Sequence, residues 1–307
     1  MSTPTKAGTA NRPEAIRAVP VRHPGRWVAV AVIALVVAMF IHSLFTNPNW
    51  QWSFQWQNAF RGPVLHGVWT TIWLTIAAMA MGVVLGIVLS VMRLSPNPVL
   101  SGAAWFYVWV FRGTPVLVQL VIWANLGSLY RNISLGIPFG PQWFHFETRN
   151  LVPAVAAALL GLGLNEAAYM SEIVRAGILS VDEGQTEAAS ALSLSRMQTL
   201  RRIILPQAMR VVVPPTGNET ISMLKTTSLV AYVPYYELFF QTSAIGSRTF
   251  QVFPMLVTAS LWYLAMTSVL MIGQYYIERY YARGSVRNLP PTPIQKLRMR
   301  LTRAELR

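Results

Sequence analysis

The sequence predicts an all-α membrane protein with about six transmembrane helices, and three observations support this fold class. Hydrophobic residues make up 53% of the 307 residues and charged residues only 12%, whereas charged residues make up roughly 25% of soluble domains. Apolar runs that are long enough to cross a bilayer follow one another along the chain. Both ends of the chain are rich in Lys and Arg, which favours cytoplasmic termini and therefore an even number of spans.

The composition also excludes several classes of function. The formal net charge is +14, but the basic residues gather at the ends and in short loops, which is the positive-inside pattern of membrane proteins rather than a nucleic-acid surface. The absence of cysteine excludes disulfides and thiolate metal sites. The four His are scattered without metal-ligand spacing, so we expect no metal site.

The N-terminal part reads as an addition to the rest of the chain. Residues 1–26 form a basic tail, which we place in the cytoplasm. The apolar run that follows lacks a small-x-small cleavage site, so residues 27–63 read as an uncleaved anchor span with an extracytoplasmic loop. In this loop Trp50, Trp52, Phe54 and Trp56 alternate with polar residues. A strand would explain the alternation, but an aromatic belt at the membrane interface is the preferred interpretation.

The remaining five spans form a second region, residues 64–281, and a basic cytoplasmic tail follows at 282–307. We expect a polar loop at 131–150 and an interruption of the third span at "FRGTP" (111–115), because Gly-Thr-Pro breaks a helix. The expected spans cover approximately 64–92, 99–130, 151–177, 207–233 and 253–281.

Between the fourth and fifth spans lies a water-facing insert, "EGQTEAASALSLSRMQTLRRIILPQAM" (183–209), which the span count places in the cytoplasm. It predicts helix, turn, helix: Ser195 and Gln198 fit a capping box for the second helix, and Pro206 ends that helix or begins the next. Such short helices are marginal alone and need a partner surface. A helix resting on lipid would explain the arginines of this insert, Arg196, Arg201 and Arg202, but not its acidic, Ala-lined first helix.

The insert resembles the EAA loop of permease subunits of binding-protein-dependent ABC importers. The matching residues are Glu187, Ala188, Ala189, Leu205 and Pro206. Ser193 stands where that loop has Gly, and we expect it to adopt the left-handed turn at a cost of about 1 kcal/mol.

Further segments resemble the polar amino acid branch of these permeases, which is histidine- and glutamine-permease-like. Examples are "FRGTPVLVQL" (111–120), "AAYMSEIVRAGILSV" (167–181) and "MLKTTSLVAYV" (223–233), where Thr226 replaces the usual Asp. The resemblance implies a type I importer permease fold with a coupling helix in the insert. It also implies a function, the ATP-driven import of polar amino acids such as glutamate, glutamine or related compounds, in a bacterial inner membrane.

The resemblance implies partners and no enzymatic activity in this chain. The chain has no "GxxxxGK[ST]" motif, so ATP and Mg would be bound by two copies of a separate ATP-binding cassette subunit. A second permease, identical or homologous, would complete the pore, an extracytoplasmic binding protein would deliver the amino acid, and lipids would surround the spans. The ATPase-coupling residues would be Gln185, Glu187, Ala188, Ala189, Leu192, Ser193, Arg196, Leu205 and Pro206.

Charges inside spans are costly and point to a translocation route. Asn218, Ser222 and Lys225 share a helix face, so we predict that this face lines the pore, whereas Glu219 and Lys225 lie on different faces. A structural ion pair is the main alternative for Arg112, and a solvated charge for Glu187. The predicted route residues are Arg112, Thr114, Glu166, Asn218, Glu219, Ser222 and Lys225.

Two smaller predictions concern contacts made by the helices. Glu172 and Arg175, three residues apart, should form an ion pair, and "GVVLG" (82–86) should pack closely against another helix.

An ATPase-independent secondary transporter or channel is the main alternative function, but the chain lacks the internal repeat expected of that class. A non-transporting scaffold would leave the intramembrane charges unexplained.

Overall fold

The computed structural model describes residues 24–137 and 140–281, so both predicted tails lie largely outside the described residues. The chain divides after Trp50 into two units. In the first unit, helix α1 (Pro24–Thr46) is followed by a short 3-10 helix, Pro48–Trp50. At a rise of about 1.5 Å per residue, α1 is long enough to cross a bilayer.

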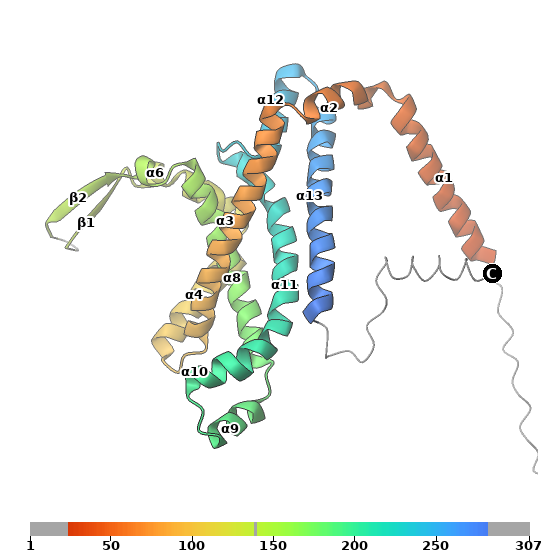
Figure 1. The fold of residues 1–307 in the computed structure, drawn as a ribbon. Helices are drawn as coiled ribbons and strands as arrows, with labels where there is room; N and C mark the ends of the chain where they lie inside the picture. Colours follow the sequence, from red (N-terminus) through yellow and green to blue (C-terminus); the bar gives the residue numbers. More distant parts are fainter. Residues whose placement is uncertain (1–23, 138–139, 282–307) are drawn as a thin grey trace, which may run out of the picture. The chain divides into compact units, whose positions relative to one another are not determined.

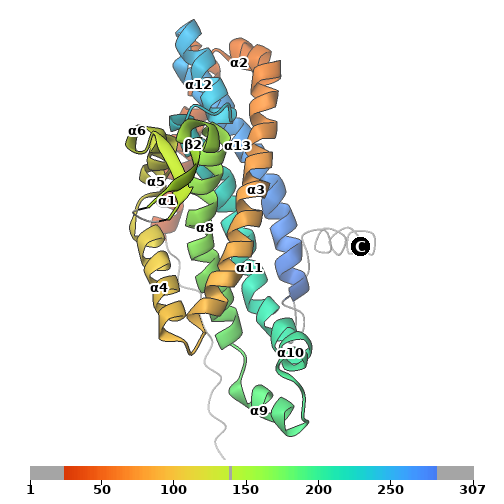
Figure 2. The same ribbon diagram turned by 90° about the vertical axis from the view of Figure 1, so that its left-hand side faces the viewer.

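The second unit is a helical bundle, shown in two views in Figures 1 and 2. Its long helices are α3 (Gly62–Arg93), α8 (Ala154–Leu179), α11 (Leu205–Thr226) and α13 (Val252–Tyr281). Among the described residues, four helices including α1 are long and apolar enough to span a membrane, and a bent pair makes a fifth. The fifth expected span, at α11, is helical but carries Arg210, Glu219 and Lys225, so it is less apolar than the others.

The predicted interruption of the third span is present. Helix α4 (Pro98–Gly113) and helix α5 (Val116–Ala124) meet at a bend of 100°. The carbonyl groups freed by this break find side-chain donors: the Gln119 amide donates to the carbonyls of Phe111 and Thr114 at 3.0 and 3.1 Å, and the Asn165 amide donates to Phe111 at 2.8 Å. These side-chain donors therefore stabilise the break, as irregular backbone inside a membrane requires.

Close packing of α3 against α8 forms the centre of the bundle, and the small residues of α3 permit it. A Cβ atom on Gly82 would lie 2.5 Å from Cγ of Glu166, and one on Gly86 would lie 2.5 Å from Cβ of Met170. The buried core beside this contact includes Leu74, Leu120 and Leu162. The predicted packing role of 82–86 is thus confirmed, and it brings Glu166 against α3.

The segments between the spans contain more structure than predicted. The prediction of a polar loop at 131–150 was wrong, because β1 (Asn132–Gly136) and β2 (Gln142–Glu147) pair there as an antiparallel hairpin. The short helices α6 (Leu126–Leu129) and α7 (Thr148–Leu151) flank this hairpin. Cross-strand pairing of Ile133 with Phe146 is the kind of contact that stabilises such a ladder.

Two more helices lie outside the expected spans. The aromatic segment favoured as an interfacial belt is helical, α2 (Trp52–Ala59), which excludes the strand alternative. Helix α12 (Leu238–Thr249) was not predicted. The buried Glu237 side chain caps it by accepting hydrogen bonds from the backbone N–H groups of Phe239 and Phe240 at 2.8 and 2.6 Å.

Candidate functional site

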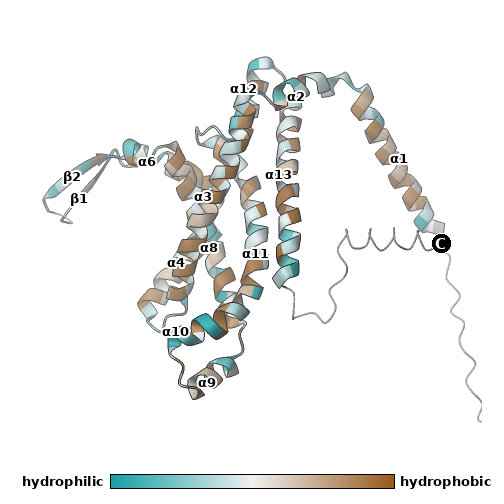
Figure 3. Ribbon diagram, in the orientation of Figure 1, coloured by the Kyte–Doolittle hydropathy of each residue, from teal (hydrophilic) through white to brown (hydrophobic). Residues whose placement is uncertain are grey.

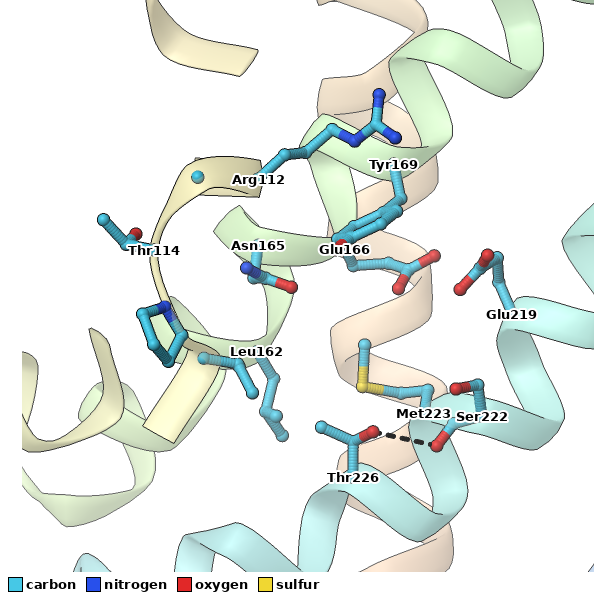
Figure 4. Close-up of a pocket in the computed structure, with 13 residues that line it drawn as sticks. Arg112, Thr114, Leu162, Asn165, Glu166, Tyr169, Glu219, Ser222, Met223 and Thr226 are labelled. Atoms are coloured by element: carbon cyan, nitrogen blue, oxygen red, sulfur yellow. Dashed lines mark hydrogen bonds between the residues drawn. The ribbon is translucent and has the colours of Figure 1, made fainter. Parts of the chain in front are cut away.

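A polar cavity of about 620 Å³ opens beside the broken third span. The break contributes Arg112, in the last turn of α4, and Thr114, where the backbone is extended rather than helical. Helices α8 and α11 form the opposite walls (Figure 4). The remaining lining residues are Gly113, Pro115, Val116, Leu162, Asn165, Glu166, Tyr169, Glu219, Ser222, Met223 and Thr226.

Two carboxyl groups dominate the chemistry of this cavity. Glu166 is only 4% exposed, and its Oε1 accepts no hydrogen bond from the residues that the structure describes. The Glu166 and Glu219 carboxyl groups point toward one another across the space between α8 and α11 (Figure 4). A buried carboxylate oxygen without a donor is costly, so this pair is suited to a ligand that brings cationic N–H groups.

The positive charge of the cavity sits at its edge. Arg112 lies in the last turn of α4, and its Cζ atom lies 5.1 Å from the ring centroid of Tyr169, in cation–π contact. Arg112, Glu166 and Glu219 are the charged residues among those that line the cavity. With both acids ionised they give the cavity a formal charge of −1.

The structure divides the predicted route residues between two places. Arg112, Thr114, Glu166, Glu219 and Ser222 line the cavity. The predicted polar face of α11, with Asn218, Ser222 and Lys225, instead lines a separate hollow of about 400 Å³ together with residues of α13, including Glu278.

Several cavity residues, including Asn165 and Tyr169, were not predicted from the sequence. The position of Tyr169 follows the helical period from Glu166, since Leu162, Glu166 and Tyr169 are spaced by four and three residues and share a face of α8. Once Glu166 was chosen, this spacing could have identified Tyr169. Nothing in the sequence shows that the face meets the break in the third span.

The insert between α8 and α11 has the predicted helix-turn-helix form, and hydropathy colouring shows its polar α10 segment in teal (Figure 3). Helix α9 (Glu183–Ala191) is capped by Asp182, and a left-handed Ser193 (φ 54°) forms the turn. The predicted capping box of Ser195 and Gln198 begins α10 (Arg196–Thr199). A π-helical turn (Leu200–Ile204) then joins α10 directly to α11, with Pro206 in the first turn of that helix.

Most of the predicted coupling residues lie on the surface of this insert. Ala189 is buried, whereas Gln185, Glu187, Ala188, Ser193 and Arg196 are exposed. Leu192 is 74% exposed. Gln207 on α11 donates to Gln185 at 3.5 Å and ties α9 to the span. The insert therefore presents a mixed polar and apolar surface joined through α10 to the helix that carries Glu219.

Beyond the cavity, the predicted ion pair of Glu172 and Arg175 is present at 2.8 Å. Arg93, the last residue of α3, joins it at 3.4 Å from Glu172. Within the described part of the chain, no cluster of His, Cys, Asp and Glu would hold a metal ion.

Comparison with known proteins decides the family. Residues 82–283 match the model of the binding-protein-dependent transport system inner membrane component. The chain belongs to this family. Among relatives, the chain is 50% identical over 285 residues to the arginine transport system permease protein ArgU of Corynebacterium glutamicum, covering 92% of this chain and 88% of that protein. It is 36% identical to the probable amino-acid ABC transporter permease protein YckA of Bacillus subtilis, covering 75% of this chain and 97% of that one.

Solved structures agree with the family assignment. A crystal structure of an amino acid ABC transporter with histidines matches with a TM-score of 0.60 and 32% identity, covering 71% of this chain and 94% of that chain. The MetNI methionine ABC transporter shares the fold, with a TM-score of 0.58 at 19% identity. The protein is therefore a translocation subunit of an amino-acid ABC importer with the type I permease fold, and the secondary-transporter alternative is not favoured.

Proposed function

We propose that this family member forms the translocation path for a cationic amino acid such as arginine, within the polar amino acid class that the sequence indicates. The observation that carries the proposal is the charge pattern of the cavity. Arginine has two cationic groups and one carboxylate, and the cavity has two carboxyl groups, Glu166 and Glu219, and one guanidinium, Arg112. ArgU, a relative at 50% identity, is an arginine transport permease, which supports the same substrate.

The geometry supports a role for each charge. Glu166, buried and with an oxygen that lacks a donor among the described residues, receives a cationic N–H group, and Glu219 receives the second. Arg112 at the edge of the cavity receives the α-carboxylate, for which a planar guanidinium is well suited. The hollow beside Asn218 and Lys225 remains a predicted further part of the route.

The energy for transport comes from outside this chain. A separate ATP-binding subunit in two copies binds ATP and Mg, and the α9 surface with Glu187 docks on it. Closure of the ATPase moves the insert, and the direct helical connection of α10 with α11 carries that motion to Glu219. A second permease, identical or homologous, an extracytoplasmic binding protein and a bacterial inner membrane with cytoplasmic termini complete the proposal.

Binding of radiolabelled arginine to the purified permease–ATPase complex tests the substrate assignment. Without the binding protein, only the membrane site is measured. Glu166→Gln and Glu219→Gln should each raise the Kd by about thirtyfold, because a charged hydrogen bond contributes about 2 kcal/mol. Glu147→Gln is the matched control, since Glu147 lies in the hairpin outside the cavity. Unchanged arginine binding in both cavity variants, or preferential binding of glutamate by the wild type, would refute the assignment.

A further inference from the structure

The cavity shares a wall with a second hollow of about 410 Å³. Arg112, Gly113 and Tyr169 line both spaces, so the wall consists of the end of α4 and one side chain of α8. The second hollow is otherwise lined by Arg93, Trp105, Val108, Trp109 and Glu172. The contact of Arg112 with Tyr169 therefore lies at the boundary of the two spaces.

That contact holds a long, exposed side chain in one place. Arg112 is an exposed residue near the end of α4, close to the extended Thr114. Its Cζ atom lies 5.1 Å from the Tyr169 ring centroid, within the range of a cation–π attraction. Helix α8 sets the position of the ring, because Tyr169 lies on the same face of this helix as Glu166, three residues further along. Figure 4 shows Arg112 beside this ring, at the edge of the cavity.

Without the ring, the carboxyl groups of the cavity would be the remaining partners for the Arg112 guanidinium. Glu166 and Glu219 line the same cavity, and a guanidinium pairs strongly with carboxylates away from bulk water. Such a pair would neutralise the groups that a cationic substrate needs. The aromatic contact therefore keeps Arg112 at the boundary, available to a substrate carboxylate without occupying the cation sites.

The second hollow offers a cation much less than the cavity does. Its acid, Glu172, is already paired with Arg93 at 3.4 Å and Arg175 at 2.8 Å. A cationic substrate that moved into this space would exchange the carboxyl groups of Glu166 and Glu219 for that of Glu172, whose charge is already neutralised. The difference in free carboxyl groups thus favours tight binding of a cation in the cavity and weak binding in the second hollow.

We infer that Tyr169 is a positioning residue for the substrate site: it holds Arg112 at the boundary of the two hollows, which keeps Glu166 and Glu219 open to a cationic substrate. The inference rests on the proposed cationic substrate. It assigns to Tyr169 an effect on binding that acts through Arg112 and not through direct contact with the cationic groups.

A double-mutant cycle on the purified permease–ATPase complex tests this inference, with the Kd of radiolabelled arginine as the readout. The variants are Tyr169→Leu, Arg112→Gln and the combination of both, and Tyr169→Met is a second ring-free variant in case the leucine form does not assemble. Tyr169→Leu should weaken binding about tenfold, the order expected for loss of a partly desolvated cation–π contact. In the Arg112→Gln background the same change should weaken binding less than about twofold, because residues that act as a unit are non-additive. Tyr169→Phe keeps the ring and should retain tight binding.

The outcomes distinguish a positioning role of Tyr169 from a purely structural one. An equal loss in both backgrounds, or the same loss with Phe as with Leu, would show a purely structural role and overturn the inference. Unchanged binding in an assembled ring-free variant would overturn it as well, while arginine binding by the wild type leaves the proposed substrate intact. A wild-type complex that prefers an acidic or neutral amino acid would overturn both.

Discussion

The position of Glu166 depends on a glycine of another helix. Gly82 on α3 leaves the space that Cγ of Glu166 occupies, at 2.5 Å from where a Cβ atom would lie. The sequence predicted that 82–86 packs closely, because small residues at this spacing permit helix contact. It did not predict the partner, since the contact between α3 and α8 joins residues that are far apart in the chain. A glycine predicted to serve packing therefore also fixes the position of a residue that lines the cavity.

Replacing this glycine tests that dependence. Gly82→Ala should lower the thermal stability of the complex, with an overpacking cost of about 1–3 kcal/mol, and should weaken arginine binding because the Glu166 carboxyl group is displaced. Gly102→Ala is the matched control: Gly102 lies on α4, where a Cβ atom would meet nothing within 4 Å, and Ala favours the helix. Equal effects of the two variants on stability and binding would contradict the assignment.

At the scale of the elements, the local signals of the insert were sufficient to predict its helix-turn-helix form. The capping box, the turn at Ser193 and the start of a helix near Pro206 are all present, because each depends on residues within a few positions. The π-helical turn that makes α10 continuous with α11 had no such signal. The hairpin at 132–147 was missed because its pairing residues are separated by a turn and its apolar side chains lie among polar ones.

Reversal of one charge on α9 tests the coupling surface. Glu187 is exposed on α9, so Glu187→Lys should leave the permease folded and inserted. It should lower substrate-stimulated ATP hydrolysis by about tenfold or more, because reversing a charge at an interface replaces attraction with repulsion. Glu187→Gln removes the charge without reversing it and should give a smaller loss. Wild-type ATPase stimulation and uptake by Glu187→Lys would show that Glu187 is only a solvated charge.

At the scale of the whole molecule, hydropathy and charge predicted the succession of spans, and the bundle follows that order (Figure 1). The family match covers 82–283, and the described N-terminal helix α1 falls in a separate unit; its interpretation as an added anchor stays a prediction. The division of the route residues between two hollows could not be predicted. It depends on the 100° bend between α4 and α5 and on how α11 faces α8 and α13.

The most direct test of the account is ATP-driven uptake into proteoliposomes that contain this chain, its ATPase and its binding protein. The cavity charges predict ATP-dependent uptake of labelled arginine that excess lysine reduces and excess glutamate does not. Omission of the ATPase should abolish uptake. Uptake that persists without the ATPase would contradict the ABC mechanism, and uptake of glutamate in preference to arginine would contradict the assigned site.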